Sequence, residues 1–192
     1  MLRFRAGESA AFSALLQRYQ RPIYTFVLRY LGPHQASLAE DLTQETFLRV
    51  VKNAASYDAH AKFSTWLYTL ARNLCIDAHR RFKHRRAQSL DAPAGNEGDD
   101  RSPLIERTQD TGPAVDRQVM GKQLQLRLQL AIATLPEDQR EVFLLREVTD
   151  LQFKEIAVIV GISENTVKSR MRYAMEKLRT ELTDLEELAR SP

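Results

Sequence analysis

A stretch rich in proline, glycine and acidic residues divides this 192-residue chain into two parts. Residues 89–113 contain three prolines and three glycines, and residues 91–113 carry six acidic side chains against two basic ones. This composition leaves too little apolar surface to drive packing and is typical of a linker. We therefore expect two small domains, residues 1–88 and 114–192, joined by a flexible acidic linker at residues 89–113.

Both expected domains carry the apolar spacing of helices. In the first, Leu67, Leu70 and Leu74 follow the i, i+3, i+7 order of one helix face, and Gly32 with Pro33 ends an earlier helical run. In the second, helical patterns cover about 116–133, 152–160 and 164–180, and a fresh helix start follows Leu135. No strand pattern occurs, so the predicted fold class is all-α.

Charge and cysteine content narrow the possible functions. Residues 1–90 carry fourteen basic against six acidic side chains, although the whole chain has a net charge of only +3. Such asymmetry favours a polyanionic partner, with a solvated basic surface as the alternative. The lone Cys75 excludes an internal disulfide and a multi-cysteine metal site, so no metal or cofactor is expected. Neither a signal peptide nor an apolar run long enough to cross a membrane is present, which predicts a cytoplasmic protein.

Residues 151–170 have the pattern of a helix–turn–helix. Phe153, Ile156 and Val160 give the first helix a core face. Gly161 suits the left-handed conformation that the tight turn requires, and Ser163 is a natural N-cap for the second helix. A short glycine-containing turn between two helices is the spacing of a DNA-reading motif.

The second helix of this motif has a polar outer face. Helical angles place Val167 and Ala174 inward and place a group of polar and basic side chains nearly opposite: Asn165, Lys168, Ser169 and Arg172, with Arg179 farther along. Amide, guanidinium and hydroxyl groups on a helix that fits the major groove are suited to reading base edges and phosphates. The alternative is an amphipathic helix whose basic face is merely solvated.

A second concentration of aromatic and basic residues lies at 63–86. Trp66, Asn73 and Arg80 share one face of the expected helix, and the preceding loop adds Tyr57 near that face. Aromatic rings beside a cationic track can stack bases while the charges follow phosphates, as in single-strand binding. For Phe63 and Trp66 alone, however, a place in the hydrophobic core is the favoured interpretation.

Taken together, these motifs resemble the extracytoplasmic-function (ECF) sigma factors of bacterial RNA polymerase, within the sigma-70 superfamily. The resemblance rests on residues 7–12, 39–47, 63–73 and 135–140 and on the helix–turn–helix, in that order across a linker. It implies a first domain similar to sigma region 2, which binds core polymerase and melts the −10 promoter element. It also implies a second domain similar to region 4, which reads the −35 element.

The resemblance also implies roles for matching positions. The segment Asp41–Lys52 is similar to the surface that docks on the clamp helices of the largest polymerase subunit, with Asp41, Gln44, Glu45 and Arg49 as its polar contacts. A plain solvated face is the alternative for each. The loop from Tyr57 to Lys62, with Asn73, resembles the pocket that captures a flipped −10 base. Lys168, Ser169 and Arg172 match positions that read the −35 duplex. The family further implies core RNA polymerase and promoter DNA as partners, a cognate anti-sigma factor that can hold the protein at the inner membrane, and no small-molecule substrate.

Two other classes of function compete with this one. A free-standing helix–turn–helix regulator is the runner-up, but the first domain lacks the pattern of a phosphoacceptor domain. An enzyme is the third, because Cys75 and His79 lie at i and i+4. Two such residues without a third make no metal site, and a partly buried, inert cysteine is the favoured interpretation. The chain is therefore not expected to be an enzyme.

Overall fold

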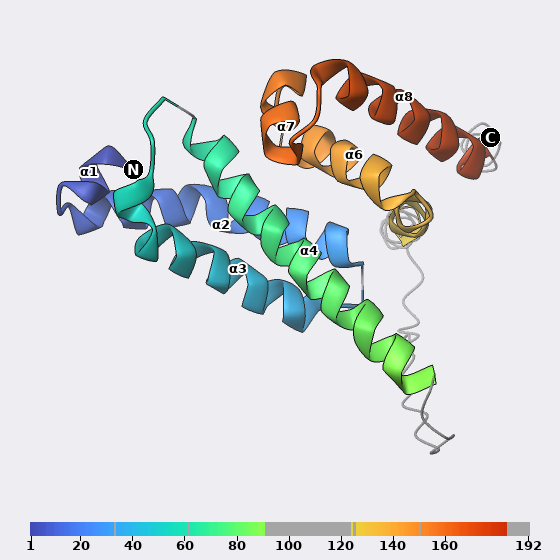
Figure 1. Ribbon diagram of the computed structural model, residues 1–192, viewed down its shortest axis with the longest axis horizontal. Helices are drawn as coiled ribbons and strands as arrows, with labels where there is room; N and C mark the ends of the chain where they lie inside the picture. The colour runs from blue at the N-terminus through green and yellow to red at the C-terminus, as the bar shows by residue number, and fades with distance from the viewer. Residues whose placement is uncertain (33, 61, 91–123, 125, 150, 184–192) are drawn as a thin grey trace, which may run out of the picture.

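The computed structural model describes residues 1–32, 34–60, 62–90, 124, 126–149 and 151–183, and side chains in α4 up to Phe82. Every regular element in those residues is a helix, which confirms the all-α prediction. Figure 1 shows two groups of helices side by side, α1 to α4 in blue to green and α6 to α8 in orange to red. The expected linker falls almost wholly outside the described residues.

The first domain is built on three long helices. α2 (Ser9–Leu31), α3 (Ala36–Lys52) and α4 (Phe63–Leu90) pack against one another, and the short α1 (Leu2–Arg5) and the 3₁₀ turn η1 (Ala54–Ser56) close one end. α2 continues through Pro22 and ends at Gly32, whose positive φ of 103° stops the helix as the sequence predicted. The core of the domain includes Phe26, Val50 and Leu67, all fully buried.

The second domain is the predicted helix–turn–helix with one supporting helix. α6 (Glu137–Thr149) packs on α7 (Phe153–Val160) and α8 (Glu164–Glu181), and residues 126–133 are also helical. α6 begins with Glu137 and Asp138, whose negative charges favour the positive end of the helix dipole. Val142, Ile156 and Val167, one from each helix, are fully buried. Most of the helix expected from about residue 116 precedes the described residues.

The two domains contact each other directly. α6 packs against α2, and α7 packs against α4, so α2 and α4 together form the face of the first domain that meets the second (Figure 1). The buried apolar residues of both domains form one continuous cluster. This contact surface follows from no pattern in the sequence, because it joins residues from opposite sides of the linker.

Candidate nucleic-acid interface

The turn between α7 and α8 fixes the angle at which α8 is presented. Gly161 follows α7 in the left-handed conformation, with φ 76° and ψ 34°, and its N–H bonds to the carbonyl of Ala157. The Ser163 hydroxyl oxygen accepts a hydrogen bond from the backbone N–H of Thr166 at 3.1 Å. Both features confirm what the sequence predicted for this turn.

α8 presents the predicted polar face to solvent. Val167, Ala174 and Leu178 are buried against the rest of the domain. The side chains on the opposite side are all exposed: Asn165, Lys168, Ser169, Arg172 and Arg179. Lys168 is paired with Glu164 at 2.7 Å, a weak contact between exposed groups that gives way readily to a phosphate. The structure thus gathers the predicted −35 residues on one accessible helix face.

The start of α4 carries a cluster of aromatic rings. The Tyr57 ring lies 5.2 Å from the Trp66 ring and 6.1 Å from the Phe63 ring, and Phe63 also meets Tyr19 at 5.4 Å. Tyr57 is only 7% exposed, and burial, with the nearby charge of Asp58, raises the pKa of its phenol. Phe63 and Trp66 are half-buried in this cluster, consistent with the core role that was favoured for them.

Polar members of the predicted −10 site surround this cluster and continue along α4. Asn73 and Arg80 are exposed on α4, and Lys62 is exposed just before the helix begins. In the preceding loop, the His60 ring Nδ1 lies 2.6 Å from Asp58 Oδ1, and this hydrogen bond raises the pKa of His60. Sequence reasoning did not single out this pair, whose only signal is an i, i+2 spacing in a loop.

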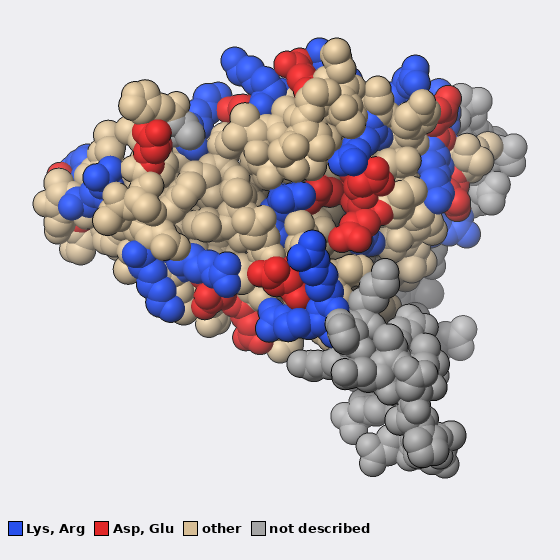
Figure 2. All heavy atoms as spheres, viewed as in Figure 1, with Lys and Arg blue, Asp and Glu red and all other residues tan. Residues whose placement is uncertain are grey.

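Two of the basic side chains of this region are engaged by the second domain. Lys62 Nζ lies 2.8 Å from Glu155 Oε1 on α7. Arg72 makes a bidentate contact with Glu141 on α6, from Nε to Oε1 at 2.5 Å and from Nη2 to Oε2 at 3.2 Å. Glu141 is only 5% exposed. Figure 2 shows acidic and basic side chains mixed where α4, α6 and α7 meet. No pattern in the sequence indicates either pair.

The predicted polymerase-docking helix α3 has an open outer face. Asp41 and Gln44 are exposed, and Glu45 pairs with Arg49 at 3.1 Å. Leu48, 52% exposed, lies one turn beyond Gln44 on the same face, and sequence reasoning missed it. The sequence feature that could have revealed Leu48 is its position outside the apolar spacing that forms the core face of α3. Val51, 43% exposed, is a second apolar side chain on this face, and a polar face with exposed apolar side chains is suited to binding another protein.

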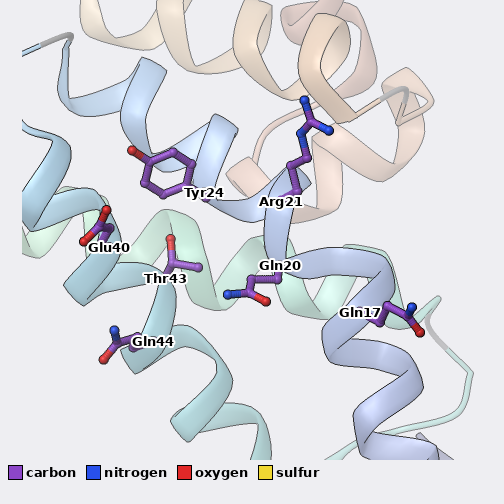
Figure 3. Close-up of a pocket in the computed structure, with 7 residues that line it drawn as sticks. All are labelled: Gln17, Gln20, Arg21, Tyr24, Glu40, Thr43 and Gln44. Carbon is purple, nitrogen blue, oxygen red and sulfur yellow. The ribbon is translucent and has the colours of Figure 1, made fainter.

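A polar groove of about 510 Å³ lies between α2 and α3 beside this face. Figure 3 shows its lining, with side chains contributed by both helices: Gln17, Gln20, Arg21, Tyr24, Glu40, Thr43 and Gln44. The lining carries three amides, two hydroxyls and two charged groups, so the groove offers hydrogen-bond partners beside apolar surface. Gln44 belongs both to the groove and to the predicted docking face.

The described part of the chain shows neither a metal cluster nor a membrane-spanning helix. Its side chains include no group of three or more metal-ligand candidates placed to share one ion. None of its helices combines the length and the apolar character needed to cross a bilayer.

Comparison with known proteins decides the family. Residues 15–86 match sigma-70 region 2, and residues 125–178 match sigma-70 region 4. The ECF RNA polymerase sigma factor SigW of Bacillus subtilis is 36% identical over 182 residues, covering 94% of each chain. The chain belongs to the ECF sigma factors. Its function is therefore that of an RNA polymerase sigma factor in transcription initiation, and a free-standing regulator is not favoured.

Other known proteins are similar in sequence or in fold over nearly the whole length. RNA polymerase sigma factor CarQ of Myxococcus xanthus is 34% identical over 191 residues, covering 99% of this chain and all of CarQ. Among solved structures, RpoE in complex with the anti-sigma factor NepR from Bartonella quintana has a TM-score of 0.66 at 22% identity, covering 90% of this chain and 97% of RpoE. CnrH in complex with the cytosolic domain of CnrY also has a TM-score of 0.66, at 20% identity, covering 93% of this chain and 92% of CnrH. At these identities the structures establish the shared fold.

Proposed function

We propose that this sigma factor divides promoter recognition between its two domains, with α4 and its preceding loop holding the −10 element and α8 reading the −35 element. The proposal depends on the outer face of α8, where five polar or basic side chains are exposed. The Gly161 turn and the Ser163 cap hold this helix in place. A helix of this kind fits the major groove of duplex DNA. The domain boundaries at 88 and 114 belong to the same proposal.

Readout of the −35 duplex rests on three kinds of side chain. Arg172 and Lys168 can donate to the O6 and N7 atoms of guanine, and Asn165 can pair with adenine. Ser169 and Arg179 are placed for base-edge or phosphate contacts on the same face. The exposure of all five supports this assignment, because none has to leave a buried position to reach DNA.

Capture of the −10 element rests on the aromatic cluster and its polar surround. A base that leaves the duplex costs a few kcal/mol of unstacking, which stacking on Trp66 or Tyr57 and hydrogen bonds from Asn73 can offset. Because Tyr57 is 7% exposed, its ring must turn outward or receive the base at its edge. Lys62 and Arg80 then follow the phosphates of the unwound strand.

Docking on core polymerase rests on α3. Asp41, Gln44, Glu45 and Arg49 line its accessible side, and the clamp helices of the largest polymerase subunit are the proposed partner. The catalytic steps of RNA synthesis stay with the polymerase, so this chain acts as an initiation factor rather than as an enzyme. Because it acts together with RNA polymerase, we expect this chain in the cytoplasm.

A dedicated anti-sigma factor is the second proposed partner. RpoE, which shares the fold, was solved in complex with the anti-sigma factor NepR, and CnrH was solved with the cytosolic domain of CnrY. If the anti-sigma factor of this chain is membrane-bound, it holds the sigma factor at the inner membrane until a signal releases it.

The test is run-off transcription from a promoter library, with bacterial core polymerase and the full-length chain. Sequence-specific starts should require the chain, and they should weaken with Arg172→Ala by about tenfold to a hundredfold at −35 sequences, since one bidentate base contact provides roughly 1–3 kcal/mol of discrimination. Asn73→Ala should instead reduce starts through the −10 element. Arg29→Ala, on the exposed surface of α2, is the matched control. Starts that do not depend on the chain would contradict the proposal.

A further inference from the structure

A hydrogen bond ties α1 to the loop that follows η1, the loop proposed to receive the −10 base. Arg5 Nη1, on α1, donates to the backbone carbonyl of Tyr57 at 2.9 Å, and the bond is partly buried. Because the donor is a guanidinium, the bond is charge-assisted and stronger than one between neutral groups. It joins two segments that lie 52 positions apart in the chain.

The bond is made where the loop leaves the 3₁₀ turn. Tyr57 is the residue directly after η1, and its backbone is extended, with φ −65° and ψ 120°. Its carbonyl belongs to the peptide group that links Tyr57 to Asp58. Since a peptide group is planar, a partner that fixes the direction of this carbonyl limits backbone rotation on both sides of it. Arg5 therefore acts on the direction in which the loop begins.

The helix that carries Arg5 is anchored in the first domain. The Phe4 ring of α1 lies 5.1 Å from the Phe12 ring of α2, and Phe12 lies 6.5 Å from Phe47 of α3. Such ring pairs stabilise a contact beyond the burial of their surface. α1 also contacts η1 directly. Arg5 thus reaches the loop from a packed helix.

Tyr57 connects this bond to the −10 cluster. Its ring lies 5.2 Å from the Trp66 ring. On the other side of its carbonyl, Asp58 Oδ1 accepts the backbone N–H of His60 at 3.0 Å, which folds the next residues into a local turn. A rotation of the backbone at Tyr57 would move the ring and this turn together. The geometry of the cluster therefore depends on Arg5, which is not a member of it.

We propose that Arg5 is a positioning residue for −10 recognition. By holding the Tyr57 carbonyl, it keeps the ring and the loop in the arrangement that distinguishes the preferred −10 base from the other three. This inference rests on the proposed function of the loop, whereas the contact between Arg5 and Tyr57 does not. An exposed arginine can instead contact a phosphate of the unwound strand. A phosphate contact adds equally to the binding of every −10 sequence, whereas a positioning residue affects the choice of base.

Fluorescence of Trp66, the one tryptophan of the chain, tests the positioning in the free, full-length protein. Arg5→Met keeps an apolar stem and removes the donor. Without the bond the Tyr57 ring should move away from Trp66, so the emission should shift to longer wavelength and quenching by acrylamide should increase. Arg3→Met is the matched control, because Arg3 pairs with Glu8 at the surface, and it should change neither signal. Helical content by circular dichroism should be the same for all three proteins. Identical Trp66 emission and quenching in wild type and Arg5→Met would overturn the proposal.

Promoter binding by polymerase reconstituted with each variant tests the choice of base. The fragments carry the strongest −10 element from the promoter library, or that element with its most selective base replaced by each of the other three. Arg5→Met should weaken binding to the preferred fragment by roughly tenfold, as expected for the loss of one charge-assisted hydrogen bond, and should weaken the others much less. Arg5→Lys, which keeps a charged donor, should recover part of the discrimination. Arg3→Met should behave as wild type.

Three other outcomes would count against the proposal. Equal weakening on all four fragments, with a shallower dependence of affinity on salt, would identify Arg5 as a phosphate contact. Unchanged discrimination despite altered Trp66 emission would show that the bond holds the loop without serving base choice. If polymerase with the wild-type chain does not discriminate among the fragments, the proposed function of the loop is wrong and this inference falls with it, while the fluorescence still decides whether Arg5 holds Tyr57.

Discussion

Cys75 illustrates how a single residue reflects the packing of both domains. Helical angles place it to one side of the core face of α4, and the sequence predicted partial burial. In the structure it is 0% exposed. Burial, and then the nearby charge of Glu141, raises the pKa of its thiol. Because Glu141 belongs to α6, the second domain contributes to the surroundings of this residue, which a pattern confined to α4 cannot reveal.

The thiol of Cys75 should accordingly be unreactive in the native protein. An aromatic disulfide reagent at pH 8 should label it at least a hundredfold more slowly than in the unfolded chain, because both access and the thiolate fraction are reduced. Since the folded state keeps the thiol protonated, this group should also lower stability as pH rises above about 9, where the unfolded thiol ionises. Chemical denaturation at pH 7 and pH 10 measures that loss, and Cys75→Ser should reduce it. Rapid native labelling would contradict the burial.

At the scale of elements, the turn into α8 was predictable because its requirements are local. A tight turn needs a left-handed residue, so Gly161 was expected to take that conformation. An unpaired N–H at a helix start needs an acceptor, so the Ser163 hydroxyl was expected to cap α8. The polar face of α8 followed from a period of about 100° per residue. The two pairs across the domains were not predictable, since an arginine such as Arg72 on an amphipathic helix has the same pattern whether it faces solvent or a carboxylate 69 positions away.

Gly161 offers a clean test of that local argument. A Cβ built at this position meets nothing within 4 Å, so substitution is opposed by backbone conformation alone. Gly161→Ala should lower the free energy of unfolding of the second domain by about 1 kcal/mol. Gly161→Asn should lower it less, because asparagine tolerates the left-handed region better. Thermal denaturation of both variants checks the order, and equal losses would mean that the glycine is needed for another reason.

At the scale of the whole molecule, the sequence predicted two domains but not their contact. The buried clusters of the two domains are continuous, and the partners that join them are separated by the linker in the chain. Residues 91–123 have enough covalent length, roughly 100 Å when fully extended, for the domains to reach promoter elements about 85 Å apart. The same chain can therefore keep its domains in contact, as in this structure, or hold them apart.

High salt should separate the two domains. The Lys62 side chain is 67% exposed, so its pair with Glu155 is screened by added ions, while the more buried pair of Arg72 is screened less. Raising sodium chloride from 0.05 to 0.5 M should increase the radius of gyration of the wild-type chain gradually and that of Glu155→Gln hardly at all. A wild-type chain insensitive to salt would show that the buried contacts alone hold the domains together.

The two carboxylate oxygens of Glu155 make separate contacts. Oε1 faces Lys62 across the domain boundary, while Oε2 accepts the backbone N–H of Gln152 at 2.8 Å and so caps α7 from within its own domain. When Lys62 withdraws, that internal hydrogen bond persists and the freed oxygen meets water. Separation of the domains thus leaves the N-terminal cap of α7 in place. The DNA-reading domain then needs no refolding before it meets a promoter.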